Sequence, residues 1–154
     1  MSFFDSMNIS ATGLAAQRLR MDVISENIAN ANTTRTSDGG PFSRRTVVFE
    51  PAAQASFASA LSGAMTGAGG TARAGGQGRG VRVSRIATDE LQGPRVYDPA
   101  HPDADEEGYV QMPNVNIVME MVNMISASRS YEANITAMNV TRGMITRTME
   151  LGNS

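Results

Sequence analysis

Apolar residues recur at intervals of seven along the first segment of the chain. This interval returns the chain to the same side of an α-helix, so the pattern predicts one apolar stripe on an amphipathic helix over residues 2–33. The stripe consists of Met7, Leu14, Met21 and Ile28, with Ala11, Ala15 and Ile24 beside it. The polar stretch that follows contains Gly39, Gly40 and Pro41, which end the predicted helix.

A second, longer helix is predicted over residues 114–151, which contain no proline. Two series with an interval of seven run along it and together give the alternating spacing of a coiled-coil seam. The first series is Ile117, Met124, Tyr131, Met138 and Ile145, and the second is Met121, Ser128, Ile135, Arg142 and Met149. Gly143 is its weak point, costing about 1 kcal/mol relative to alanine. We expect the stripe on the first helix to pack against this helix.

The region between the two helices has strand-like segments and a long glycine-rich stretch. The segments with strand composition are Arg45–Phe49, Val81–Val83 and Val96–Tyr97. From Pro51 to Gly80 few large apolar residues occur, so burial cannot offset the loss of backbone entropy, roughly 1–2 kcal/mol per residue. We predict a flexible loop there, with a short helix at residues 57–65 as the alternative.

The predicted fold is mainly α: two terminal helices form a discontinuous coiled-coil pair around a small β-containing, loop-rich insert. The predicted segments are an N-terminal helix over 1–35, a middle region over 36–110 with a flexible loop near 51–80, and a C-terminal helix over 111–154 that pairs with 1–35.

Composition narrows the choice of function. Leu, Ile, Val and Phe make up about 19% of the chain, close to the level at which disorder sets in, so ordered parts are expected beside disordered ones. No cysteine is present for a disulfide or a thiolate metal site. The 13 basic residues are all arginine and are scattered, which argues against nucleic-acid binding. The first residues lack the pattern of a cleaved secretory signal, and no apolar run is long enough to span a membrane.

The stretch from Asp98 to Val118 contains the single histidine, His101, among several carboxylates. Part of it matches a calcium-binding loop, but Asn114 stands where the bidentate glutamate is required. A zinc site would need a second histidine, and the glycine-rich GGQGRG is followed by a strand pattern where a phosphate site needs a helix. We therefore expect no metal, cofactor or catalytic residue. The stretch is predicted to be a structured entry loop, with Asn114 or Asn116 capping the long helix.

Two segments resemble a known family. LRMDVISENIANANTTRTSDGGPF resembles the N-terminal signature of bacterial flagellar axial proteins, whose N-x-A-N-x-x-T core falls at Asn27, Ala29 and Asn30 and, displaced by one residue, Thr33 and Thr34. EMVNMISASRSYEANITAMNVTRGMI resembles the family's C-terminal helix, with its R-x-Y-E-x-N core at Arg129, Tyr131, Glu132 and Asn134. DPAHPDADEEGYVQMPNVNIV is similar to a segment peculiar to the proximal rod subtype of the basal-body rod proteins.

The resemblance implies a structural rod subunit of the bacterial flagellar basal body, located in the periplasm. It implies export through the flagellar type III apparatus without a cleaved signal, and assembly with copies of itself, with proximal and distal rod proteins and with the base of the rod at the membrane ring. The resulting helical tube would transmit motor torque. The residues expected at the assembly interface are Met7, Leu14, Met21, Asn27, Ile28, Asn30, Ile117, Met121, Met124, Arg129, Tyr131, Asn134, Ile135, Met138 and Ile145.

Two other readings of the sequence remain at this point. A cytoplasmic coiled-coil adaptor or chaperone-like protein would use the same two helices in a fold that is stable without partners. A metal-dependent enzyme would use His101 and the acidic cluster. The asparagine groups also have a simpler reading, in which Asn27 and Asn30 cap the first helix and Tyr131 is merely buried.

Finally, the acidic residues Asp103, Asp105 and Glu107 are expected to pair with arginines of a neighbouring subunit.

Overall fold

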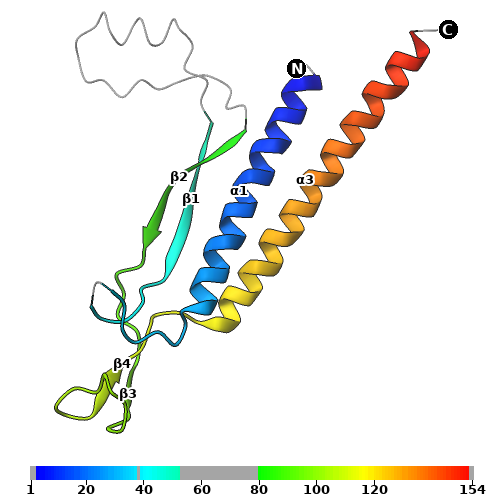
Figure 1. The fold of residues 1–154 in the computed structure, drawn as a ribbon. Helices are drawn as coiled ribbons and strands as arrows, with labels where there is room; N and C mark the ends of the chain where they lie inside the picture. Colours follow the sequence, from blue (N-terminus) through cyan, green and yellow to red (C-terminus); the bar gives the residue numbers. More distant parts are fainter. Residues whose placement is uncertain (1–2, 38, 53–79, 153–154) are drawn as a thin grey trace, which may run out of the picture.

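A computed structural model describes residues 3–37, 39–52 and 80–152 of the chain. Two long helices stand side by side, and the β-strands lie between them in the sequence (Figure 1). The elements are α1 (Phe3–Ala29), β1 (Arg45–Pro51), β2 (Val81–Thr88), β3 (Arg95–Tyr97), β4 (Tyr109–Gln111) and α3 (Ile117–Leu151). The prediction of two long terminal helices around a small β-containing region is confirmed at this level.

Side-chain hydrogen bonds fix the helix ends that face the β region. At the end of α1, the Asn30 amide donates to the carbonyl oxygen of Glu26 at 2.9 Å, and its Oδ1 accepts from the Thr33 hydroxyl at 3.2 Å. At the start of α3, Asn116 Oδ1 accepts from the backbone N–H of Met119 at 3.1 Å, which is an N-cap. The prediction of an asparagine cap is therefore confirmed, with Asn116 rather than Asn114 in that position.

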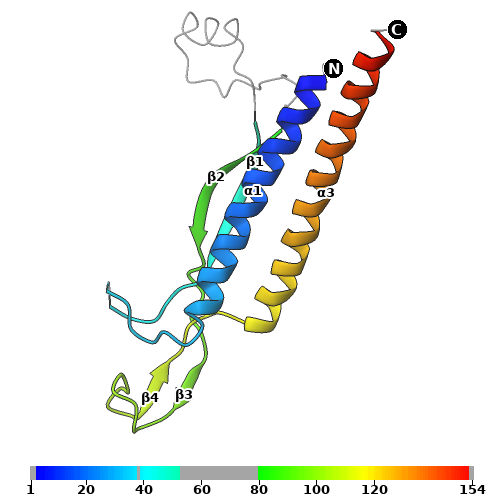
Figure 2. The same cartoon turned by 45° about the vertical axis from the view of Figure 1, so that its right-hand side comes forward.

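The four strands form two separate antiparallel pairs. β1 pairs with β2 from Arg45 opposite Thr88 to Pro51 opposite Val81, with an irregularity between Val48 and Phe49. This pair packs against α1, on a different side from α3 (Figure 2). β3 and β4 form a short hairpin beyond the ends of the helices (Figure 1).

The strand boundaries differ from the prediction in several places. The second predicted strand, Val81–Val83, extends to Thr88 because it follows β1 along its whole length. The three-residue strand β4 was missed, because too few residues alternate there to give a sequence pattern. Pro51, predicted in the flexible loop, ends β1. Residues 53–79 of that loop, which include the alternative helix at residues 57–65, lie outside the described residues.

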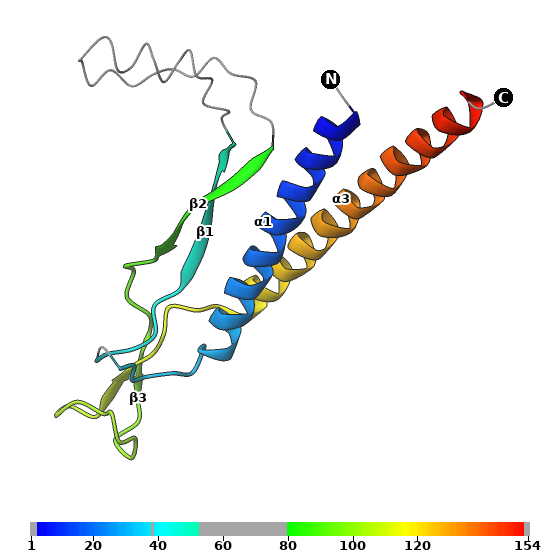
Figure 3. The same cartoon turned by 45° about the horizontal axis from the view of Figure 1, so that its top comes forward.

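The helices α1 and α3 run antiparallel and contact each other along much of α1 (Figure 3). On α3 the buried positions are Glu120 and Ala127, and half-buried side chains at Met124, Tyr131, Asn134 and Met138 continue the same row. The first predicted series, from Met124 onward, is thus partly covered by α1. The second predicted series was placed one residue too late. Its members Met121 and Met149 are exposed, whereas residues one position earlier, such as Glu120, Ala127 and Asn134, are buried or half-buried.

The first helix is most deeply buried at positions other than its predicted stripe, except at Ile24, which was predicted beside that stripe. Met7, Leu14, Met21 and Ile28 are half-buried, and the neighbouring Ala11 and Ala15 are exposed. The deeply buried residues of α1 are Ser10, Ala16, Val23, Ile24 and Asn27. The reason is that α1 contacts two partners, the β1–β2 sheet and α3, so its buried surface is wider than one stripe and is displaced from it.

The two helices approach each other closely at Gly13 of α1. Gly13 lies directly against Asn134, and a Cβ atom added at Gly13 would be 3.0 Å from the Asn134 Oδ1 atom. At Gly143, in the later half of α3, an added Cβ atom would meet no other atom within 4 Å.

No described helix is long and apolar enough to cross a membrane.

These two glycines give a matched pair of stability measurements. Replacing Gly13 by leucine forces a bulky side chain against Asn134, so the free energy of unfolding should fall by about 1–3 kcal/mol. Gly143→Ala should instead raise it by about 1 kcal/mol, because alanine favours the helix and has free space there. Thermal unfolding followed by circular dichroism measures both. An unchanged midpoint in Gly13→Leu would contradict the close approach of the two helices.

Candidate functional site

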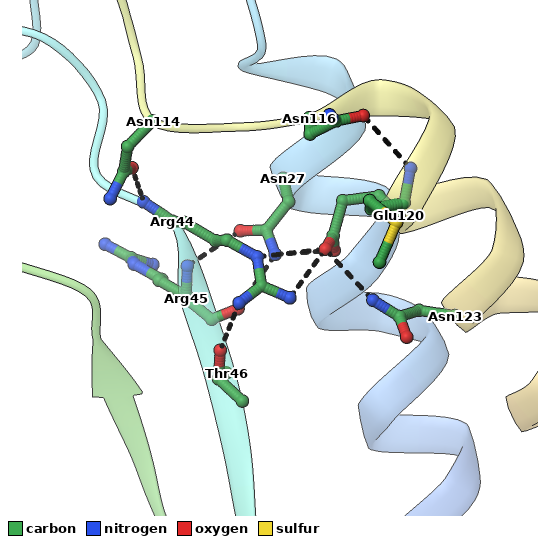
Figure 4. A network of polar contacts seen from close by, with 9 residues as sticks. Asn27, Arg44, Arg45, Thr46, Asn114, Asn116, Glu120 and Asn123 are labelled. Carbon is green, nitrogen blue, oxygen red and sulfur yellow. Dashed lines mark hydrogen bonds and ion pairs between the residues drawn. The ribbon is translucent and has the colours of Figure 1, made fainter. Parts of the chain in front are cut away.

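A buried carboxylate lies where α1, β1 and α3 meet (Figure 4). Glu120, in the first turn of α3, is only 1% exposed. Its Oε1 accepts from Arg44 Nε at 2.9 Å, Arg44 Nη2 at 2.7 Å and Asn123 Nδ2 at 3.2 Å, and its Oε2 accepts from Asn27 Nδ2 at 3.0 Å. A buried charge requires such partners, because an unpaired one is expensive to remove from water.

The Asn27 side chain ties α1 to β1 as well as to α3. Its Oδ1 accepts from the backbone N–H of Arg45 at 2.9 Å, and its Nδ2 donates to the Arg45 carbonyl oxygen at 2.8 Å. The amide thus pairs with both backbone groups of one strand residue while it also donates to Glu120. Asn27 is 0% exposed, and an aspartate or leucine there would leave at least one of these groups without its partner.

Asn114 connects the segment before α3 to both long strands. Its Oδ1 accepts from the backbone N–H of Arg44 at 2.7 Å, and its Nδ2 donates to the carbonyl oxygen of Asp89 at 3.2 Å. The backbone N–H of Asp89 in turn donates to the Arg44 carbonyl oxygen at 2.8 Å. We call Asn27, Arg44, Asn114, Glu120 and Asn123 the polar junction. It fixes five segments of the chain relative to one another.

The charge of Glu120 is stabilised by its partners. Burial works to raise its pKa, but hydrogen bonds from Asn27 and Arg44, with the positive charge of Arg44, outweigh burial and hold the pKa below the ordinary value of 4.5. Both carboxylate oxygens already accept hydrogen bonds from protein groups. This arrangement suits a structural ion pair, whose role is to fix orientation, rather than a proton-transferring group.

The acidic stretch forms the loop between β3 and β4. Asp105 Oδ1 accepts from the backbone N–H groups of Glu107 at 3.0 Å and Tyr109 at 2.8 Å, and the hydrogen bond from Tyr109 contributes most to lowering the pKa of Asp105. Gly108 has a φ of 82°, a conformation that favours glycine. The predicted structured entry loop is thus confirmed. Among the described residues, no three His, Asp or Glu side chains are arranged to hold a metal ion.

Two of the acidic residues contact arginines of the same chain, and their expected pairing with arginines of a neighbouring subunit stays a prediction. Asp103 accepts from the Thr34 hydroxyl at 2.8 Å and lies 3.6 Å from Arg35 Nη1, and Asp105 pairs with Arg95. The N-terminal signature therefore contacts the acidic loop directly. Glu107, the third of these residues, is exposed, as is its neighbour Glu106.

The residues expected at an assembly interface differ in how far they are buried within the single chain. Asn27 is buried in the polar junction, while Asn30 bonds within its own turn, as the capping alternative had it. Asn134 lies against Gly13, and Tyr131 is half-buried. The half-buried group is Met7, Leu14, Met21, Ile28, Met124, Met138 and Ile145, and the exposed group is Ile117, Met121, Arg129 and Ile135. Ile117 and Ile135 are 42% and 37% exposed, and their expected packing against α1 stays a prediction.

Sequence reasoning missed Arg44 and Glu120. Glu120 was detectable, because it stands three residues after Ile117 and four before Met124, where the other register of a coiled-coil seam places an apolar residue. A charge at such a position needs a buried partner. Arg44 gave no comparable signal, since nothing in the sequence indicates which of the 13 basic residues reaches it.

Comparison with known proteins bears on the whole chain. Residues 7–35 match the family described as "Flagella basal body rod protein", and residues 106–151 match "Flagellar basal body rod FlgEFG protein C-terminal". The chain is 46% identical to the flagellar basal-body rod protein FlgC of Bacillus subtilis, over 99% of both chains. The chain belongs to the flagellar basal-body rod protein family. This assignment confirms the resemblance, and it makes the protein a structural rod subunit.

Further relatives support this membership across distant bacteria. The chain is 47% identical to the FlgC protein of Borreliella burgdorferi, over 94% of this chain and 93% of that one. It is 39% identical to the FlgC protein of Aquifex aeolicus, over 97% of both. The two family matches contain Asn27 and Glu120 respectively, so the polar junction connects the two regions by which rod proteins are identified.

The polar junction predicts a pH dependence of stability. Since the pKa of Glu120 is lowered by folding, its contribution should be complete above pH 4.5 and should be lost as the pH falls through the lowered pKa. Glu120→Gln should reduce the free energy of unfolding at neutral pH by about 1–3 kcal/mol, because Arg44 loses its charged partner. The difference from the unchanged protein should shrink in acid.

Denaturant unfolding at several pH values measures this difference. Glu106→Gln is the matched control, because Glu106 is an exposed carboxylate of the acidic loop. If Glu120→Gln followed the pH profile of the unchanged protein, with a constant offset, the buried ion pair would not be the source of the dependence.

Proposed function

We propose that this rod subunit assembles with copies of itself and with other rod proteins into the helical tube of the proximal rod, which transmits motor torque. The observation that carries the proposal is the apolar surface that α3 leaves open on the side away from α1. Val118 is 70% exposed, and Met121, Val122 and Ile125 are each more than half exposed. Exposed apolar patches of this kind mark interaction surfaces.

The two helices would act as one assembling unit. The covered positions of α3 alternate in steps of three and four from Glu120 to Met138, which is the spacing of a coiled-coil seam, and this supports a coiled-coil pair. In this proposal residues 1–35 and 111–154 form the axial part of the subunit. Residues 36–110 form a separate middle part, held to the axial part by the polar junction.

The place of action follows from the family. We propose that the subunit works in the periplasm as part of the rod, contacts the base of the rod at the membrane ring, and reaches it through the flagellar type III export apparatus without a cleaved signal. The exposed apolar side chains of α3 support this route, because helices whose apolar residues are left uncovered gain less stability from packing. They would become fully ordered only against neighbouring subunits, where their exposed apolar residues are covered.

Met124 tests the role of the helix pair in assembly. Met124→Asp places a charge at the half-buried seam, so α1 and α3 should separate and the subunit should fail to assemble. In a strain lacking the natural subunit, this variant should be expressed but should not restore swimming. Met124→Leu, which keeps the size and apolar character, is the control and should restore it.

The assay scores swimming in soft agar and the amount of protein in purified basal bodies. Normal swimming with Met124→Asp would contradict the role of the seam. Absence of the unchanged protein from purified basal bodies would contradict the proposed function itself.

A further inference from the structure

A cleft lined by arginines lies beside the polar junction, between α1, β1 and the first turns of α3. Its volume is about 370 Å³, which is within the range of pockets that hold a ligand or side chains of a partner. Its arginines are Arg20, Arg44 and Arg45, and the only carboxylate among its described lining residues is Glu120. Figure 4 shows Arg44 and Glu120 on the wall that the cleft shares with the polar junction. The lining residues therefore carry more positive than negative charge.

Arg20 differs from the other two arginines, because it makes no hydrogen bond or ion pair with another described residue. Arg44 is paired with the buried Glu120, and Arg45 Nη1 lies 2.7 Å from Glu26 Oε1. Arg20 is nevertheless half-buried. A guanidinium group stays protonated and presents its N–H groups in an arrangement that matches a carboxylate. The group that fits beside Arg20 is therefore a carboxylate.

The apolar walls of the cleft strengthen such a contact. Val23 and Ile24 of α1 are 4% and 5% exposed, and both line the cleft together with the half-buried Phe49 of β1. A carboxylate that enters is partly removed from water, and its attraction to a guanidinium group rises as the local dielectric constant falls. Asp22, two residues after Arg20 on α1, is exposed and does not line the cleft. The described part of the chain thus supplies no carboxylate to Arg20.

The most acidic stretch of the chain is the loop between β3 and β4. We call residues 98–108 the acidic loop, which contains five carboxylates and no basic residue. Two of these carboxylates contact arginines of the same chain, whereas Asp98, Glu106 and Glu107 are exposed and form no ion pair with another described residue. No residue of the acidic loop lines the cleft of its own chain, and the loop lies beyond the ends of the helices (Figure 1). Its exposed carboxylates are therefore available to another molecule.

We propose that the acidic loop of one copy docks into the arginine-lined cleft of a second copy of this chain, with Glu106 and Glu107 facing Arg20. This rests on the proposed function, which requires copies of the chain to assemble, and it names the two surfaces that meet. A second copy is the partner because this chain itself carries both surfaces, and their uncompensated charges are opposite. Complementary charges of this kind fix the orientation of the partners.

The contact joins two unlike surfaces, so it has a direction. The cleft lies alongside α1, whereas the acidic loop lies beyond the helix ends (Figure 1). When two copies have joined, one of them still presents an open cleft and the other a free acidic loop. Unlike surfaces that meet in this way generate an open helical assembly unless the rotation between copies closes it. A helical tube requires contacts of this kind.

The chain contains no cysteine, so engineered thiols can report the contact. Thr46→Cys places a thiol at the cleft, which Thr46 lines, and Ala100→Cys places one at an exposed position of the acidic loop. The full-length double variant is expressed in a strain lacking the natural subunit, and purified basal bodies are treated with a short bismaleimide crosslinker. We expect covalent dimers on a denaturing gel, in which mass spectrometry finds position 46 of one copy joined to position 100 of another.

Control variants distinguish this contact from other ones. Either single variant should give no dimer, because the two surfaces are unlike. Ala100→Cys combined with Thr136→Cys, which is exposed on α3 and outside the cleft, should give none either. Absence of the 46–100 dimer, or joining of these positions only to a different protein, would overturn the docking and leave the rod function intact. If the unchanged protein were absent from basal bodies, the proposed function would fail first, and the docking with it.

Charge variants test the carboxylates without disturbing the fold. Glu106→Gln and Glu107→Gln, made together in the double-cysteine protein, remove two exposed charges that form no ion pair within the described residues. The yield of the 46–100 dimer should fall severalfold, or the variant should be lost from basal bodies. Glu132→Gln, at an exposed carboxylate of α3, is the matched control and should change neither. An unchanged yield in the first variant, or an equal loss in both, would overturn the proposal.

A charge exchange tests Arg20 itself. Arg20→Glu in the double-cysteine protein should also lower the yield severalfold, because the cleft then repels the acidic loop. Adding Glu106→Arg and Glu107→Arg to the same chain should restore the yield. The same low yield in both proteins would show that Arg20 does not receive these carboxylates.

Discussion

The architecture depends on one ion pair, between the buried carboxylate of Glu120 and the guanidinium group of Arg44. Glu120 begins the last helix, Arg44 precedes the first strand, and Asn27, near the end of the first helix, donates to the same carboxylate. Segments far apart in the sequence are thereby held in one place. Such a pair adds little net stability compared with apolar packing, but losing one partner is costly. Its contribution is to define how the helices and the sheet lie relative to each other.

The helix contact includes a close approach and leaves large apolar residues of α3 exposed. Gly13 of α1 lies directly against Asn134 of α3, and Ala127 and the half-buried Met124 and Met138 lie in the same row of α3. Larger apolar residues such as Val118 and Met144 are left outside. Exposed apolar side chains of this kind are available for contacts with other molecules. This arrangement suits the proposed assembly, in which these side chains would contact neighbouring subunits.

The sequence predicted the existence and type of the main elements because long apolar periodicity is a strong signal. It was less successful with the surfaces of the helices. Met7 and Leu14 of the predicted stripe are only half-buried. The reason is that α1 contacts a sheet as well as a helix, and a single seven-residue period does not show which residues face which of these two partners. The Glu120–Arg44 pair was missed since it joins distant residues. The family motifs, in contrast, include Asn27 and Asn134, which lie in the polar junction and against Gly13, respectively.

Hydrogen exchange on the purified protein, resolved along the chain, tests most directly whether the polar junction organises the subunit. The account predicts that the slowest amides lie in the last turns of α1, at the start of β1 and in the first turns of α3. Protection should decrease along both helices toward Phe3 and Leu151, where fewer contacts hold them. Equal protection along the two helices, or faster exchange around Asn27 and Glu120 than at the helix tips, would contradict the central role of this buried ion pair.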